Sequence, residues 1–221
     1  MGGFKRKSNN IDFKQNLFSL IILHISKCCE IMRKDYEITD KKLDNDEDII
    51  TNHLVHEYLN EASSRLLFIP QMPVHYDTKT YKYKGRVDIA VNSRDQFSVN
   101  SEAYYIIECK RIDGNTHLNR EYVSAGISRF VTQPLPKYSS YYKNNIMLGY
   151  VVQATNVGEN TKKIDTLQRE LLIDVTIGEM LLVCNDEKGL SHYQCLYKAK
   201  DNFNVELAHL FYNFSEVMRS E

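Results

Sequence analysis

The chain lacks an excess of charge of either sign. Its 221 residues carry 28 Lys and Arg against 29 Asp and Glu, which gives a formal net charge of −1 at pH 7. A strongly basic surface is therefore excluded as its general character, and nucleic-acid binding would have to rest on a local basic patch. The hydrophobic fraction of 43% is ordinary for a globular protein, and the length suffices for one sizeable core.

Zinc-binding spacings and an even number of cysteines are also missing. The five cysteines include no CxxC or Cys/His arrangement that suits zinc, and the seven histidines build no such site either. We interpret the cysteines as reduced thiols of a cytoplasmic protein, because disulfides are rare in that compartment.

The apolar run from Leu17 to Ile25 is too short to cross a membrane. A bilayer span requires about 20 apolar residues. Basic residues precede the run, as in a secretory signal, but Lys27 follows it and no small-residue cleavage site is present. We therefore interpret this run as an amphipathic helix and expect no membrane partner.

Hydrophobic periodicity and breaker residues predict alternating helices and strands. Helices are expected at about 11–34, 46–64, 119–132, 160–173 and 203–219, and strands at about 66–76, 80–92, 103–112, 145–154, 179–185 and 191–198. This order predicts an α/β fold with a mixed β-sheet flanked by helices. The charged stretch 35–48 is the linker candidate, which divides the chain into an N-terminal helical accessory segment (1–46) and a main domain (47–221).

Three ionisable residues occupy two of the predicted strands. Asp88 lies between Val87 and Ile89 in the second strand, and Glu108 and Lys110 lie near the end of the third. Because side chains alternate along a strand, Glu108 and Lys110 share a face, and a suitable register brings Asp88 to them. Buried charges are costly unless they are paired or bind a cation. The pattern therefore predicts a hard-cation site with a basic helper, with a structural ion-pair cluster as the alternative.

These residues and their context resemble the PD-(D/E)xK nuclease superfamily. A helix with a Glu precedes Val87-Asp88, then Glu108-Cys109-Lys110 ends an apolar strand, and a helix and a strand follow. The match covers about residues 47–154. Val87 stands where the motif has Pro, a departure that such families tolerate because the Pro supplies no chemistry.

The resemblance implies a restriction-endonuclease-like core of order αβββαβ, with an extra N-terminal helix and C-terminal α/β elements. It implies a nuclease that hydrolyses phosphodiester bonds, with DNA favoured over RNA. Asp88, Glu108 and the backbone carbonyl of Cys109 would hold Mg²⁺, or alternatively Mn²⁺, with positions left for water and phosphate. Lys110 would position or help deprotonate the attacking water.

The superfamily often adds an acidic residue from the first helix of the core. Glu57 and Glu61 are the main candidates here, and Glu47 is a third. Glu57 is the choice because it lies beside Leu54 and Tyr58, on the edge of the helix that is expected to face inward. An exposed helix face is the alternative interpretation.

Residues after the motif are candidates for contact with nucleic acid. Arg129 belongs to the next predicted helix and is a candidate phosphate contact, whereas Lys137 and Tyr138 belong to a basic and aromatic loop. A surface salt bridge and loop packing are the respective alternatives. Gly126 and Gly149 are expected to mark close approaches between elements.

Two other functions compete with the nuclease. One is a non-catalytic nucleic-acid-binding or assembly module that retains the fold, and the other is an unrelated α/β protein whose charged triplet binds something else. The N-terminal helical segment is expected to serve homodimer formation, a partner protein or substrate grip.

Overall fold

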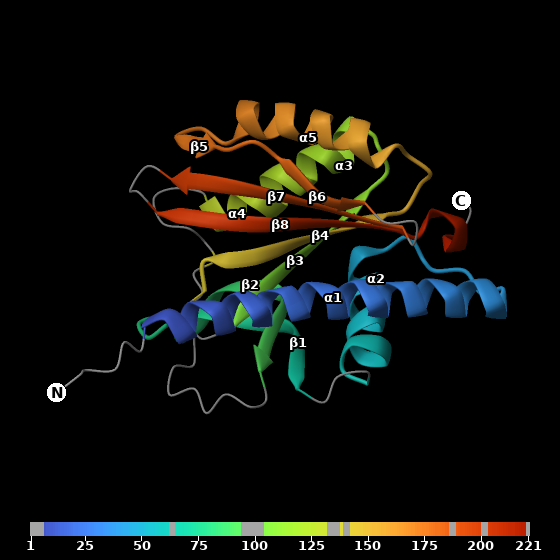
Figure 1. Cartoon of the computed structure of the whole chain (residues 1–221), viewed down its shortest axis with the longest axis horizontal. Coiled ribbons are helices and arrows are strands. Elements are labelled where there is room, and N and C mark those ends of the chain that lie inside the picture. The colour runs from blue at the N-terminus through green and yellow to red at the C-terminus, as the bar shows by residue number, and fades with distance from the viewer. Residues whose placement is uncertain are drawn as a thin grey trace.

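The structure is mixed α/β, with one sheet between two layers of helices (Figure 1). The computed structural model describes residues 7–61, 65–93, 104–131, 138, 142–185, 189–199 and 203–219. Within these ranges the sheet has eight strands. The predicted mixed sheet flanked by helices is confirmed.

The sheet has the strand order β1-β2-β3-β4-β8-β7-β5, and β6 also pairs with β7. The strands are β1 (Leu66–Asp77), β2 (Lys82–Ser93), β3 (Tyr105–Ile112), β4 (Asn144–Val151), β5 (Val175–Ile177), β6 (Leu181–Asn185), β7 (Leu190–Ala199) and β8 (Asn204–Asn213). The first three strands are antiparallel, β4 is parallel to both β3 and β8, and the remaining pairs are antiparallel. The segments predicted as strands at 66–76, 80–92 and 103–112 agree with β1 to β3 to within two residues.

Helices cover both faces of the sheet (Figure 1). They are α1 (Lys7–Thr39), α2 (Glu47–Leu54) with the π-helical turn η1 (Val55–Leu59), α3 (Thr116–Glu121), the π-helical turn η2 (Tyr122–Ile127), α4 (Ser128–Val131), α5 (Val157–Leu171) and the 3₁₀ turn η3 (Ser215–Val217). The first layer consists of α1, α2 and η1, and the second consists of α3, η2, α4 and α5.

The central strand β4 is buried on both faces. Ile146, Leu148 and Tyr150 pack into the apolar cluster under α1, whereas Met147 and Val151 pack into the cluster under η2 and α5. Side chains alternate along a strand, so a strand between two helical layers must be apolar at nearly every position. This explains the nearly continuous apolar run in its sequence.

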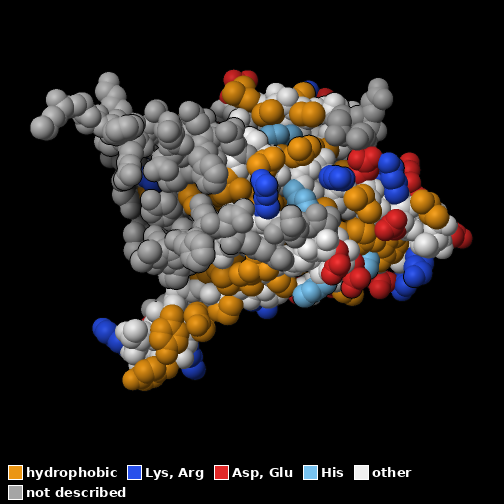
Figure 2. Space-filling view, turned by 60° about the horizontal axis from the view of Figure 1, so that its bottom comes forward, with side chains coloured by type: hydrophobic (Ala, Val, Ile, Leu, Met, Phe, Trp, Pro, Cys, Tyr) orange, Lys and Arg blue, Asp and Glu red, His pale blue; other side chains and the backbone are white. Residues whose placement is uncertain are grey.

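The long helix α1 packs along the sheet. Its buried residues Ile21, Ile25 and Met32 belong to the same apolar cluster as the sheet residues beneath it. The predicted boundary at residue 46 falls in the loop between α1 and α2. Within the described part of the chain, no helix combines the length and apolar character needed to cross a membrane. On the α1 side, the described side chains mix acidic, basic and hydrophobic types and form no broad basic surface (Figure 2).

The predicted closing helix over 203–219 is wrong. Residues Asn204–Asn213 form β8, which lies between β4 and β7 in the sheet, and only the short turn η3 follows it. The strand is buried over most of its length on both faces. The segment shows no strict alternation of apolar and polar residues, so its hydrophobic periodicity does not distinguish a two-sided strand from a helix, which explains the error.

Candidate metal centre

The candidate site lies where β2 stops pairing with β3. Ladder pairing between the two strands ends at Ile89 and Ile107. Two positions further along β3, the N–H of Cys109 donates to Asp88 Oδ2 at 2.8 Å instead of to β2. Buried backbone donors require a partner, so Asp88 replaces the missing ladder bond and is itself fixed by it. Because the two strands separate here, side chains can contact the backbone at this edge of β3.

Glu47 supplies the acidic residue from the preceding helix. It begins α2, directly after the N-cap residue Asp46. Its Oε2 accepts from the N–H of Arg111 at 3.3 Å, and its Oε1 accepts from Lys110 Nζ at 2.7 Å. The Arg111 side chain also donates to the carbonyl of Asn45 at 2.6 Å. These bonds hold the start of α2 against the end of β3.

The choice of Glu57 as the helix acid is corrected by this arrangement. Glu57 lies in η1 with an exposed side chain, and Glu61 is exposed as well. The site faces the first turn of α2, and ten residues of helix rise by about 15 Å, which carries Glu57 past it. The feature of the sequence that indicates Glu47 is its position directly after the helix-capping residue Asp46.

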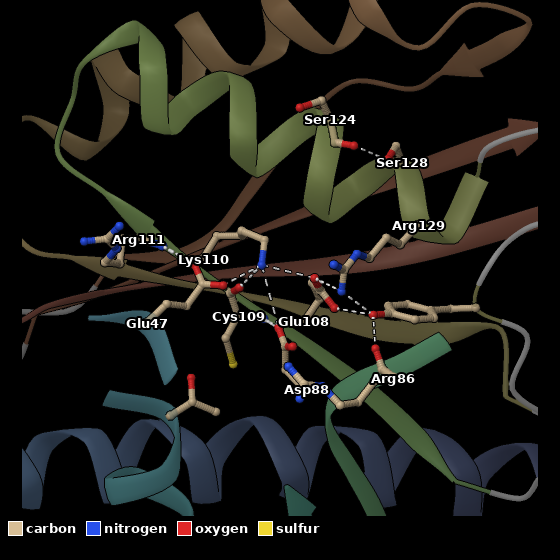
Figure 3. A network of polar contacts seen from close by, with 12 residues as sticks. Glu47, Arg86, Asp88, Glu108, Cys109, Lys110, Arg111, Ser124, Ser128 and Arg129 are labelled. Carbon is tan, nitrogen blue, oxygen red and sulfur yellow. Dashed lines mark hydrogen bonds and ion pairs between the residues drawn. The ribbon is translucent and has the colours of Figure 1, made fainter. Parts of the chain in front are cut away.

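The ammonium of Lys110 lies at the centre of the cluster (Figure 3). Its Nζ is 2.6 Å from the Cys109 carbonyl oxygen and 2.7 Å from Glu47 Oε1. It is also 3.1 Å from Glu108 Oε1 and 3.8 Å from Asp88 Oδ2. The predicted convergence of Asp88, Glu108 and Lys110 is confirmed, and oxygens from four residues surround one cationic position.

Glu108 is the most enclosed of the three acids, since its side chain is 0% exposed. Its Oε1 forms ion pairs with Lys110 and with Arg129 NH1, the latter at 2.8 Å, but accepts no hydrogen bond from the described residues. Its Oε2 is 2.8 Å from the hydroxyl of Tyr138. Burial and the charge of Asp88 raise the pKa of Glu108 to about 7, although Lys110 and Arg129 act in the opposite direction.

Lys110 is charged in this arrangement. Burial lowers its pKa, but the nearby carboxylates of Glu108, Asp88 and Glu47 outweigh burial and raise it overall. Burial likewise raises the pKa of Glu47, against the effect of Lys110. In this arrangement the three carboxylates therefore favour the ammonium form of Lys110.

The two described residues that were predicted to contact nucleic acid lie in different surroundings. The ring of Tyr138 is buried, and its hydroxyl lies 2.7 Å from the carbonyl oxygen of Arg86, which agrees with the alternative of loop packing. Burial and Glu108 both favour the neutral phenol and raise its pKa. Arg129 forms a salt bridge with the buried Glu108 rather than the surface salt bridge that was its alternative, and its side chain remains 27% exposed. Lys137 lies outside the described residues.

Two glycines allow close packing around the site, as expected. A Cβ on Gly126 would lie 2.6 Å from Met147 Cε and 3.4 Å from Lys110 Cγ, so η2 rests directly on the stem of the lysine. A Cβ on Gly149 would lie 2.6 Å from the ring of Phe211. The first contact helps to confine Lys110 beneath the second layer of helices.

The oxygens of the cluster fit a hard divalent cation. Carboxylate and backbone carbonyl oxygens are the protein ligands of Mg²⁺ and Mn²⁺. Among the described residues, no three Asp, Glu, His or Cys side chains are already grouped as metal ligands. The positions of two side chains account for this: the ammonium of Lys110 lies among the acids, and Glu108 is turned toward Arg129 and Tyr138.

Comparisons with known proteins identify no family. A scan against protein-family models finds no match, and searches of curated proteins and of solved structures return none either. The class that the fold defines is thus a mixed α/β protein with helices on both faces of its sheet. The charged cluster around Lys110 is the feature that points to a more specific function.

Proposed function

We propose that this protein is a Mg²⁺-dependent nuclease, with Mn²⁺ as an alternative cation. The observation that carries the proposal is the approach of four oxygens to one cationic position, occupied by the ammonium of Lys110. These oxygens belong to Glu47, Asp88, Glu108 and the Cys109 carbonyl. The cluster holds three acids, Glu47, Asp88 and Glu108, against two cations, Lys110 and Arg129. One acid is therefore in excess when all three are ionised, which favours a further cation.

The order of the elements supports a restriction-endonuclease-like core. The sequence α2, β1, β2, β3, α3 and β4 has the αβββαβ order, with three antiparallel strands followed by a helix and a parallel strand. Asp88 and Glu108 lie on β2 and β3, where the resemblance to the PD-(D/E)xK superfamily requires them. The same resemblance favours DNA as the substrate.

Each residue of the cluster has a chemical role in this proposal. A bound divalent cation would neutralise charge at the phosphate and activate the attacking water. Asp88, Glu108 and the carbonyl of Cys109 would hold it, and Glu47 takes the role first assigned to Glu57. We assign Lys110 to positioning the attacking water or helping to deprotonate it, and to offsetting negative charge in the transition state.

A cleavage assay tests the proposal. Purified protein is incubated with plasmid and short duplex DNA in Mg²⁺, in Mn²⁺ and in EDTA. We expect cleavage with either metal and none in EDTA, and we expect Asp88→Asn and Lys110→Ala to slow cleavage on the order of 100-fold or more. Lys162→Ala is the matched control, because this lysine pairs with Glu159 on the exposed surface of α5. Unchanged metal-dependent cleavage by Lys110→Ala would overturn the mechanism.

A non-catalytic binding or assembly module is the second candidate. It is favoured by the engagement of both Glu108 oxygens with protein groups, which is also expected of a structural ion-pair cluster. The same preparation separates the two functions. A binding module would retain labelled DNA equally well in Mg²⁺ and in EDTA, and would leave the DNA intact.

A further inference from the structure

The carboxylate of Glu108 is not free to bind a cation in the described arrangement. Arg129 and Lys110 contact its Oε1 at 2.8 and 3.1 Å, and the Tyr138 hydroxyl lies 2.8 Å from its Oε2. The side chain has no exposure to solvent. Any role as a metal ligand therefore requires that at least one of these groups withdraws first.

Arg129 is the member of this group that a substrate can reach. Its side chain is 27% exposed, whereas that of Lys110 is 9% exposed. NH1 of Arg129 also lies 2.5 Å from the Tyr138 hydroxyl, and its guanidinium lies 5.6 Å from the centre of that ring. The planar guanidinium matches the geometry of phosphate oxygens as well as that of a carboxylate, so a phosphate can compete with Glu108 for it.

Tyr138 can change its hydrogen-bond acceptor when Arg129 moves away from Glu108. Its hydroxyl carries one proton and has two acceptors within reach, Glu108 Oε2 and the carbonyl oxygen of Arg86 at 2.7 Å. If it donates to Arg86, Oε2 is released and no buried hydroxyl is left without a partner. The contact of Tyr138 with Glu108 can therefore be released without leaving the buried hydroxyl unpaired.

We propose that Arg129 keeps Glu108 from binding a divalent cation until an anion draws the guanidinium away. We call this interaction between Arg129 and Glu108 the latch. A phosphodiester of the DNA backbone draws the guanidinium away from Glu108 Oε1, and Glu108 then becomes available to the divalent cation. This inference rests on the proposed nuclease function and adds a regulation to it, because DNA and metal bind with positive coupling. The coupling is reciprocal, so each of the two ligands raises the affinity for the other.

Arg129 acts through Glu108 in this proposal and is a positioning residue. The energetic reason for the coupling is that the ionised form of a buried carboxylate needs a compensating charge. Without DNA, Arg129 supplies that charge and competes with the metal. With DNA, the phosphate holds Arg129 and the metal supplies the charge instead.

Mn²⁺ binding to the DNA-free protein, measured by electron paramagnetic resonance, tests the latch. We expect Arg129→Gln to bind Mn²⁺ at least about 5-fold more tightly than the unmodified chain, and Arg129→Lys to fall between the two. Arg86→Gln is the matched control, because it removes an exposed arginine side chain close to the cluster but leaves the contacts of Glu108 in place. Equal tightening by Arg86→Gln and Arg129→Gln would mean a general effect of charge and would overturn the proposal.

DNA binding in EDTA provides the second readout. Fluorescence anisotropy with a labelled duplex should show about 3- to 10-fold weaker binding for Arg129→Gln, the loss expected for one phosphate contact. An arginine that only neutralises Glu108 would tighten Mn²⁺ binding when it is substituted, but would leave DNA binding unchanged. Should Arg129→Gln fail the check of folding by circular dichroism, Arg129→Lys and Tyr138→Phe replace it, with Mn²⁺ binding about 2-fold tighter as the expected result.

The latch and the nuclease function fail in different ways. Suppose that Asp88→Asn abolishes Mn²⁺ binding while Arg129→Gln leaves both Mn²⁺ and DNA affinity unchanged. The latch is then wrong and the metal centre stands. If the unmodified chain binds no Mn²⁺ that depends on Asp88, the proposed function itself is wrong.

Discussion

At the position of the Lys110 nitrogen, three acidic side chains share one cation. The ion pairs differ in exposure, since Glu108 is fully enclosed and Glu47 is 30% exposed at its side chain. Enclosed charges depend on their partners much more than exposed ones do, because water cannot replace a lost partner. Single substitutions within this cluster should therefore have large and separable effects.

Two glutamates distinguish the observed site from the one first expected. Glu47→Gln should reduce Mg²⁺-dependent DNA cleavage on the order of 100-fold, because it removes a carboxylate that contacts Lys110. Glu57→Gln is the matched control on the same helical segment, and its exposed side chain predicts a change of less than about 2-fold. Initial cleavage rates at saturating metal measure both. A larger loss for Glu57→Gln than for Glu47→Gln would contradict the assignment.

Removal of the central ammonium should destabilise the protein. Lys110→Met keeps much of the length of the side chain but leaves the acids without their shared cation, which should lower the free energy of unfolding by about 3 kcal/mol at pH 7. Urea unfolding gives this value directly. Because a divalent cation would then supply the missing charge, Mg²⁺ should recover part of the loss. Equal stability of Lys110→Met and the parent chain in EDTA would contradict the description of the cluster.

The alternation of side chains along strands made the residues on β2 and β3 the predictable part of this site. Glu108 and Lys110 two positions apart, with Asp88 on the neighbouring strand, were enough to predict their convergence. The contribution of Tyr138 was not predictable, because it follows a helix and reaches Glu108 through a tertiary contact. Which helical glutamate faces the site depends on where α2 begins relative to the end of β3, and no local pattern fixes that.

At the scale of elements, the beginning of α2 delivers Glu47 to the end of β3. Asp46 Oδ1 accepts from the N–H of Ile49 at 3.0 Å, which fixes the first turn of the helix. Arg111 holds the preceding residue Asn45 through two contacts. The cap of α2 and the position of Glu47 beside Lys110 are therefore linked in this part of the chain.

Asp46→Ala should affect both stability and activity. Loss of the cap should cost about 1 kcal/mol in the free energy of unfolding, and a looser first turn should slow cleavage several-fold through Glu47. Asn156→Ala is the matched control, since Asn156 caps α5 by accepting from the N–H of Glu159 at 3.0 Å. It should cost a similar free energy and leave cleavage unchanged. Urea unfolding and cleavage rates measure the pair, and equal losses of activity would contradict the link.

The sequence predicted some elements well for a physical reason. β1, β2 and β3 are bounded by turn-prone segments, so their limits could be placed closely. β8 could not be assigned, because its buried run lacks the alternation that distinguishes a strand with one exposed face. β5 has only three residues, which is too few for a periodic pattern.

At the scale of the whole molecule, a buried polar network joins the C-terminal strands to the second layer of helices. His209 on β8 lies 2.9 Å from the hydroxyl of Tyr122 on η2 and 3.1 Å from that of Tyr197 on β7. Tyr197 in turn donates to Gln168 on α5 at 2.7 Å. Burial, with a smaller effect of His192, lowers the pKa of His209 to about 3.

The lowered pKa of His209 predicts that the free energy of unfolding decreases as the pH falls. A base whose pKa is lowered by folding contributes stability above its unfolded pKa of about 6.5, and this stability is lost as the pH falls toward 3. Between pH 7 and pH 5 the loss should be about 2 kcal/mol, at about 1.4 kcal/mol for each pKa unit. Glu108 has the opposite sign, because its raised pKa favours the folded state at lower pH.

The comparison that isolates His209 is therefore between variants. His209→Gln has a side chain that does not titrate, so its free energy of unfolding should fall by about 2 kcal/mol less than that of the parent chain between pH 7 and pH 5. Urea unfolding at the two pH values measures the difference. Parallel pH profiles for the two proteins would show that His209 is not buried in its neutral form.

Anomalous X-ray diffraction from crystals soaked in saturating Mn²⁺ tests the metal centre most directly. The proposed function predicts an anomalous peak among the oxygens of Asp88, Glu108 and the Cys109 carbonyl, with the ammonium of Lys110 displaced from the position that it occupies in Figure 3. The contrary result is a Lys110 nitrogen that still contacts Glu47 and the Cys109 carbonyl, with no manganese peak at the cluster.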